Sequence, residues 1–77
     1  MKQQIKEIIA LILEINPSQI NDDSTSQEIP NWDSLNHMNI IFAIEEKFDV
    51  TFEDDELMNL TSISRIEEAI ENFRNKN

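Results

Sequence analysis

The residues with the clearest chemical potential lie in one short run, residues 32–38, with the sequence WDSLNHM. Ser34 follows Asp33 at the expected start of a helix, where Asp33 is well suited to cap the first turn. The first N–H groups of a helix are unpaired and carry partial positive charge, so this end favours an approaching or attached phosphate. A serine hydroxyl there is well placed to carry a phosphodiester.

The same run also contains the residue types of a serine hydrolase, Ser34, His37 and Asp33. All three lie within about one helical turn, and no second element is expected to orient the histidine. The chain has no glycine from which a glycine-rich oxyanion turn could form. We therefore expect no catalytic residues. Three roles remain open for His37: a surface position, packing against Trp32, and contact with an attached group or a partner. Trp32 could pack the long loop against the bundle or make such a contact.

Several other kinds of site are excluded by composition. The chain has 77 residues with no Cys and no Gly, which rules out disulfide scaffolds, cysteine-zinc sites, glycine-rich phosphate loops and the EF-hand loop. Asp22 and Asp23 with the nearby Glu28 lack the ligand spacing of a calcium loop. No metal site is expected.

The charge of the chain is strongly one-sided. Asp and Glu number 16 against 6 Lys and Arg, giving a formal net charge of -10. Nucleic acids and anionic membrane surfaces would repel such a chain, whereas basic protein surfaces would attract it. No apolar run is long enough to cross a bilayer. We expect a single cytoplasmic domain over residues 1–77, monomeric and without membrane insertion.

Hydrophobic periodicity predicts a first helix over residues 2–15. Asn16 is expected to end it in the left-handed conformation, and Pro17 prevents its continuation. A long connection follows over residues 16–33, with Ile20 and Ile29 as its anchors in the core. The apolar face of the first helix has the spacing i, i+3, i+4, i+7 and consists of Ile5, Ile8, Ile9, Ile12 and Ile15.

The second helix is expected over residues 34–48 and carries two apolar stripes. A helix in so small a bundle cannot bury both, and an exposed apolar stripe usually marks a contact site. One stripe consists of Ile40, Ile44 and Phe48 with Ile41 alongside, and the other of Leu35, Met38 and Phe42.

A short third helix is expected within residues 49–61, with the acidic residues 53–56 in its first turn. Val50 and Phe52 alternate with polar residues and could form a short extended piece. The last helix should begin near residues 62–64, with Ser64 and Glu67 at capping-box spacing, although Thr61 or Ser62 could also cap it. Residues 75–77 should fray. The expected fold is all-α: a small four-helix bundle of three longer helices and one short helix, with a long loop between the first two.

At this point the sequence resembles a known family. The run Asp33-Ser34-Leu35, followed by an apolar helix that ends in the sequence AIEEKF at residues 43–48, is similar to the acyl carrier protein family, which includes aminoacyl and peptidyl carriers. The similarity continues through the acidic residues 53–56 and the last helix, and covers essentially the whole chain.

The resemblance implies a covalent cofactor. Ser34 would receive a 4'-phosphopantetheine arm from coenzyme A through a phosphopantetheinyl transferase that uses magnesium, and Asp33 would help to position that enzyme. The terminal thiol of the arm would hold acyl or aminoacyl groups as thioesters. A loading enzyme and downstream acyl-accepting enzymes are the further partners implied. The resemblance also implies that Ile40, Ile44 and Phe48 face the core, while the partner-facing positions are Leu35, Met38, Phe42, Glu45, Glu46, Asp54 and Asp55.

Some positions depart from the pattern of fatty-acid carriers. Those carriers usually have acidic residues two and five positions after the serine, where this chain has Asn36 and Asn39, and a glycine where it has Trp32. Trp32 together with His37 is more similar to specialised carriers, such as D-alanyl carriers or carriers dedicated to one pathway. The alternative from another class is a small acidic helical regulator that masks a basic surface and has no prosthetic group.

Overall fold

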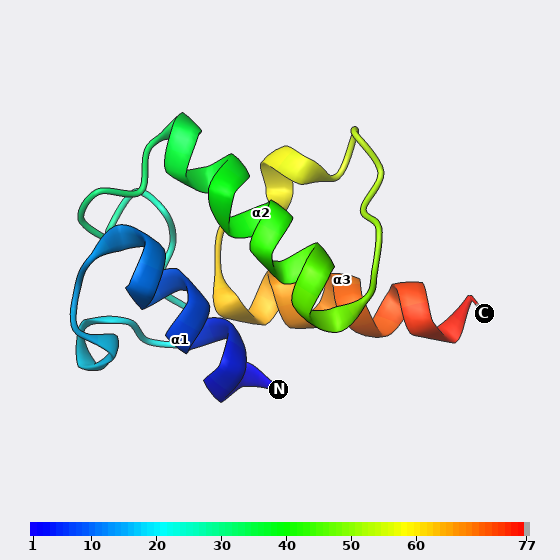
Figure 1. Cartoon of the computed structure of the whole chain (residues 1–77), viewed down its shortest axis with the longest axis horizontal. Coiled ribbons are helices and arrows are strands. Elements are labelled where there is room, and N and C mark those ends of the chain that lie inside the picture. The colour runs from blue at the N-terminus through cyan, green and yellow to red at the C-terminus, as the bar shows by residue number, and fades with distance from the viewer. Residues whose placement is uncertain (77) are drawn as a thin grey trace.

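The structure, a computed structural model, describes residues 1–76 and is all-helical over that range (Figure 1). Three α-helices, α1 (Lys2–Leu13), α2 (Ser34–Phe48) and α3 (Ile63–Asn75), are joined by connections that contain two single turns of 3-10 helix, η1 (Pro17–Gln19) and η2 (Leu57–Asn59). None of the three α-helices is long and apolar enough to span a membrane.

The short helix expected within residues 49–61 is present only as the 3-10 turn η2. The preceding acidic run forms a tight turn, in which Glu56 N–H donates to the Glu53 carbonyl at 3.0 Å and Glu53 N–H donates to Glu56 Oε1 at 2.9 Å. Hydrogen bonds of this i to i+3 kind close narrower turns than an α-helix and rarely extend beyond a few residues. The structure thus shows three α-helices in place of the predicted three longer and one short.

The first helix ends two residues earlier than predicted. Glu14 takes the left-handed conformation with φ of 58°, and Ile15 N–H donates to the Ala10 carbonyl at 3.1 Å. The expectation that Asn16 ends this helix was wrong. Asn16 is extended and its side chain caps η1 by accepting from Ser18 N–H, because Pro17 starts a new turn immediately after it.

The bounds of α2 agree with the prediction. Asp33 is its N-cap, and Asp49, with φ of 54°, is its left-handed C-cap. For α3 the Ser64 capping box was wrong, and the alternative cap Ser62 is confirmed. Ser62 caps the helix by accepting from Arg65 N–H at 3.2 Å, while the Ser64 hydroxyl donates to the Asp22 carbonyl at 3.1 Å. Residue 77, expected to fray, lies outside the described residues.

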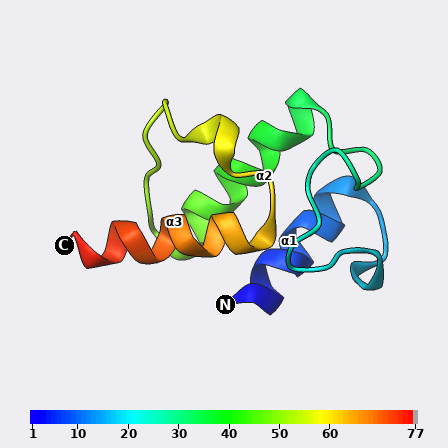
Figure 2. The same cartoon turned by 180° about the vertical axis from the view of Figure 1, so that it is seen from behind.

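The helices enclose one core of aliphatic side chains. α1 approaches both α2 and α3 closely, and α3 runs across α2 in the view from behind (Figure 2). The loop anchors Ile20 and Ile29 are buried as predicted, so the long connection is fixed to the bundle. The fully buried residues of the three helices are Ile5, Ile9, Leu13, Ile40, Ile41, Ile44, Ile63, Ile66 and Ile70.

The two stripes of α2 differ in burial as the sequence predicts. Ile40 and Ile44 are 0% exposed, whereas Leu35 is 73% and Phe42 58% exposed. Phe48 is half-buried and packs against the core, with the Arg74 guanidinium 5.9 Å from the centre of its ring. One face of α2 therefore belongs to the core, and a second apolar face, which contains Leu35 and Phe42, is exposed to solvent.

This asymmetry predicts a difference in stability between two substitutions on one helix. Ile44→Ala should lower the free energy of unfolding by about 2 to 5 kcal/mol, because it leaves a cavity in the core. Phe42→Ala, at an exposed position, should change it by less than about 1 kcal/mol. Urea denaturation followed by circular dichroism measures both. If Ile44→Ala does not fold, Ile44→Val should still lose about 0.5 to 1.5 kcal/mol, and equal losses at both positions would contradict the assignment.

Candidate functional site

The first turn of α2 is held by a network of polar side chains. Asp33 accepts from Asn36 N–H through its carboxylate at 2.8 Å and from His37 N–H through its carbonyl at 2.8 Å. Asn31, which has a positive φ of 69°, accepts from the Asn36 side chain at 2.9 Å and donates to the Leu13 carbonyl at 3.0 Å. The start of α2 is thereby fixed to the end of α1.

Ser34 lies exposed at this fixed helix end. Within residues 1–76 no hydrogen bond engages its Oγ, and none reaches the backbone N–H groups of Ser34 and Leu35. The hydroxyl is therefore accessible to a modifying enzyme, and the two N–H groups remain available to phosphate oxygens. These features fit a phosphodiester attached at this residue.

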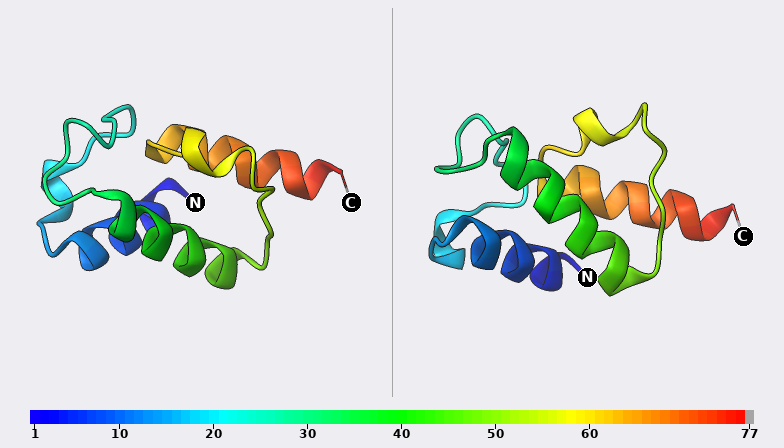
Figure 3. Two further views of the ribbon diagram at one scale, coloured as in Figure 1. Left: turned by 90° about the horizontal axis from the view of Figure 1, so that it is seen from above. Right: turned by 45° about the horizontal axis from the view of Figure 1, so that its top comes forward.

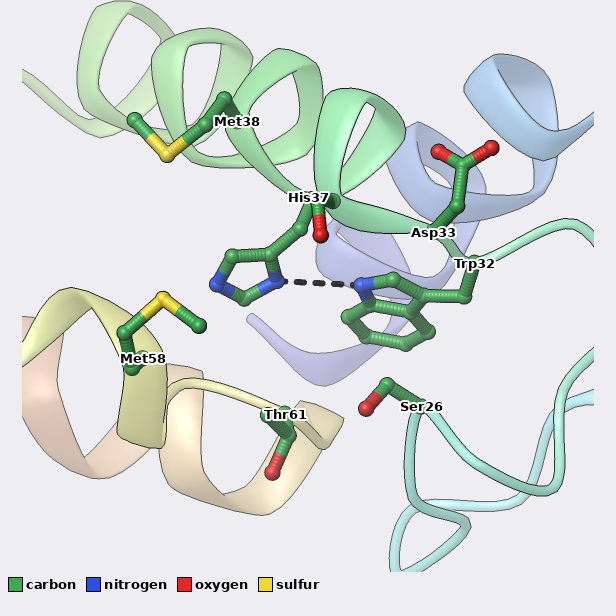
Figure 4. Close-up of a pocket in the computed structure, with 8 residues that line it drawn as sticks. Ser26, Trp32, Asp33, His37, Met38, Met58 and Thr61 are labelled. Atoms are coloured by element: carbon green, nitrogen blue, oxygen red, sulfur yellow. Dashed lines mark hydrogen bonds between the residues drawn. The ribbon is translucent and has the colours of Figure 1, made fainter.

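A cleft of about 340 Å³ opens beside Ser34 (Figure 4). Three segments form its walls: the loop before α2, the first turns of α2, and the stretch from η2 to Thr61. Its lining combines an indole, an imidazole and two thioether groups with three hydroxyl groups and one carboxylate. The cleft is lined by Ser26, Trp32, Asp33, Ser34, His37, Met38, Met58 and Thr61.

His37 occupies the base of this cleft and is only 6% exposed. Its Nδ1 accepts from Trp32 Nε1–H at 3.0 Å, and its Nε2 lies 2.7 Å from the Leu57 carbonyl oxygen. The two rings lie edge to edge, with their centroids 6.1 Å apart and their planes inclined by 28°. Packing against Trp32, one of the roles left open, is confirmed. Both ring nitrogens are bonded to groups other than Ser34, so no serine-histidine-aspartate triad is assembled.

The acidic residues proposed to meet partners differ in their surroundings. Glu46, Asp54 and Asp55 are exposed. Glu45 is half-buried, and its Oε2 accepts from Phe52 N–H at 2.9 Å, so it also holds the connection after α2 against that helix. This structural role could not be predicted from the sequence, because the partner is a backbone group seven residues away.

The apolar residues proposed to meet partners also differ in their exposure to solvent. Leu35 and Phe42 are exposed, while Met38 is half-buried in the wall of the cleft. Sequence reasoning missed Met58, which is 72% exposed, and the hydroxyl residues Ser26 and Thr61. No local pattern connects these three residues with α2. Among residues 1–76 no group of three or more His, Asp or Glu side chains is placed to hold a metal ion.

Comparison with known proteins places the chain in a family. Residues 3–70 match the family described as "Phosphopantetheine attachment site". The chain belongs to the acyl carrier protein family. It is 36% identical over 73 residues to an acyl carrier protein of Buchnera aphidicola subsp. Baizongia pistaciae, covering 95% of this chain and 94% of that one. It is 31% identical over 68 residues to an acyl carrier protein of Sulfurovum sp., covering 88% and 91%.

The fold of this family member is also found among solved structures. The solution structure of a holo acyl carrier protein from Geobacter metallireducens superposes with a TM-score of 0.81 at 20% identity, covering 97% of this chain and 86% of that one. The cofactor of the family is a covalently attached phosphopantetheine, and the exposed, unpaired hydroxyl at the start of α2 fits such an attachment.

Capping by Asp33 predicts the behaviour of two variants. Asp33→Ala should lower the free energy of unfolding by about 1 kcal/mol, because Asn36 N–H loses its acceptor. Asp33→Asn keeps a side-chain oxygen and should stay within a few tenths of a kcal/mol of the parent. Thermal and urea unfolding of the unmodified proteins measure both. If the two variants were equally destabilised, the charge and not the cap would be the source of the stability.

Proposed function

We propose that Ser34 is the attachment residue of this carrier and that the protein tethers acyl or aminoacyl groups without catalysing a reaction. The observation that supports this most directly is the exposed Ser34 hydroxyl, free of internal hydrogen bonds, on a rigidly capped helix end. Esterification by a phosphopantetheinyl transferase would form a bond from Ser34 Oγ to the phosphorus on the pantetheine side of coenzyme A. The pyrophosphate bond breaks, adenosine 3',5'-bisphosphate leaves, and the hydroxyl proton passes to a base of the transferase or to water. The attached arm supplies a terminal thiol that holds the cargo as a thioester.

The function of the protein part is presentation. A cargo tethered to a docked carrier experiences a high effective concentration at the partner's active site, without any new contact between protein and cargo. No chemical step then requires an acid, a base or a nucleophile from this chain. The bonded state of His37 supports that division of roles, since both of its ring nitrogens are engaged by Trp32 and Leu57 and neither is free to act on a group at Ser34.

We propose further that partners dock on the exposed apolar face of α2 and on the acidic side chains around it. Leu35 and Phe42 provide the apolar contact, with Met38 at its edge. The acidic set is Glu45, Glu46, Asp54 and Asp55. With a net charge of -10, these side chains would steer a basic partner surface before contact, as expected for the transferase, the loading enzyme and downstream enzymes.

The attachment residue can be tested by intact mass. Incubation with coenzyme A, magnesium and a promiscuous phosphopantetheinyl transferase should add the mass of one phosphopantetheine. Ser34→Ala should abolish the addition, because no hydroxyl remains at the helix end. Ser26→Ala is the matched control, since Ser26 also lines the cleft and should leave modification intact. An unmodified parent with several transferases would instead favour the acidic regulator without a prosthetic group.

The docking surface can be tested by the dependence of binding on salt. The double variant Asp54→Asn/Asp55→Asn should lower the association rate with the transferase by several-fold at low ionic strength and much less at high salt, because screening already weakens these charges. Glu71→Gln, an exposed position on α3, is the control for charge alone. Stopped-flow or surface-based kinetics measure the rates. Equal effects of the variants, or rates independent of salt, would exclude the acidic turn from the interface.

A further inference from the structure

The base of the cleft is a short chain of hydrogen bonds that joins three segments through one imidazole. Trp32 lies in the loop before α2, His37 on α2, and Leu57 in η2, which is 20 residues further along the chain. Figure 4 shows the indole and the imidazole side by side, with Met58 and Thr61 facing them across the cleft. One side chain thus connects both walls of the space beside Ser34.

The order of donors and acceptors in this chain of hydrogen bonds allows only one protonation state of the imidazole. The indole N–H can only donate, so Nδ1 of His37 must be the unprotonated acceptor. The Leu57 carbonyl can only accept, so Nε2 must carry the proton. His37 is therefore neutral, in the Nε2–H tautomer, when both bonds are made. A proton added at Nδ1 would remove the acceptor on which Trp32 depends.

The connection after α2 is held to the rest of the protein by hydrogen bonds and by buried side chains. Near its start, Phe52 N–H donates to Glu45, and near its end Ser26 N–H donates to the Thr61 carbonyl at 2.9 Å. Val50, Phe52 and Leu60 are buried in the core.

Between these points η2 is linked to two helices. Arg65 on α3 donates through Nη1 to the Asn59 carbonyl at 3.4 Å, and Leu57 packs against the core. The bond between His37 and the Leu57 carbonyl links η2 to α2 across the cleft. His37 therefore helps to set the width of the cleft.

We propose that His37 is a positioning residue for the attachment reaction: through Trp32 and Leu57 it holds the cleft beside Ser34 in one preformed shape. The proposal rests on Ser34 being the attachment residue, because the cleft matters to the transferase only there. The imidazole makes no hydrogen bond with the Ser34 hydroxyl and contacts no reacting atom. It acts by ordering the indole two residues before Ser34 and the η2 wall opposite.

An ordinary buried histidine would behave differently on substitution. If His37 only filled space, an apolar residue of similar size would replace it, and the cleft would keep its shape. If it orders the two walls, the replacement must offer both an acceptor and a donor. Glutamine has a carbonyl and an amide group at the end of its side chain and can supply both, whereas leucine supplies neither. The pair His37→Gln and His37→Leu therefore separates the two roles.

The first measurement uses the unmodified protein. The chain has one Trp and one His, so the indole N–H gives a single nuclear magnetic resonance signal that needs no assignment. In His37→Leu this signal should move towards that of a free indole and its hydrogen exchange should accelerate about tenfold, as expected for the loss of one hydrogen bond. His37→Gln should keep the signal near its parent position.

The functional measurement is the steady-state kinetics of modification. His37→Leu should raise the KM of the transferase for this carrier up to about tenfold while kcat stays within about twofold, because the disordered walls must be ordered on docking. His37→Gln should restore KM. The proposal is overturned if His37→Gln resembles His37→Leu, or if His37→Leu leaves both the indole signal and KM unchanged.

These outcomes are distinct from a failure of the proposed function. If the parent protein is never modified, the assignment of Ser34 fails and the kinetic part of the proposal fails with it, while the indole signal still reports whether His37 orders the cleft. If the parent is modified but His37→Leu does not fold, His37→Met takes its place as the apolar variant, and its indole signal and KM are compared with those of His37→Gln.

Discussion

The structure depends on a helix end that is fixed while its functional atoms are left unpaired. Asp33 satisfies one orphan N–H of α2 with its side chain, and the bonds around Asn31 tie this turn to α1. Capping a helix in this way prevents fraying of its first turn. The Ser34 hydroxyl and the two N–H groups beside it thus lie at a capped helix end, which would let a partner recognise the proposed attachment site before any group is attached.

The net charge and the exposed apolar surface both oppose the stability of the folded protein. A net charge of -10 destabilises a compact state by self-repulsion, and among residues 1–76 the ion pairs within 4.0 Å are those of Lys2 with Asp22 and Glu67. The burial of isoleucine side chains from all three helices must offset that repulsion. Leu35 and Phe42 stay outside the core, as the proposed docking surface would require, on the helix α2 that runs alongside α1 (Figure 3).

Much of this could be predicted from the sequence, because it depends on local rules. The spacing of Ile40 and Ile44 against Leu35 and Phe42 separated the two faces of α2, and Asp33 marked its start. The end of α1 at Glu14 and the 3-10 turn at residues 57–59 were not predicted, because tertiary contacts select among several possible local turns. The cleft was missed for a similar reason. A bond from His37 to the Leu57 carbonyl leaves no mark on the sequence, since every residue has a carbonyl.

The absence of glycine has a consequence for the unfolded chain. Glu14, Asn31 and Asp49 take left-handed conformations that glycine would adopt without strain. In exchange, the denatured ensemble is poorer in conformations, because each residue with a Cβ samples fewer backbone states than glycine does. Part of the stability of the native structure therefore comes from the lower conformational entropy of the unfolded chain, in which none of the 77 residues is a glycine.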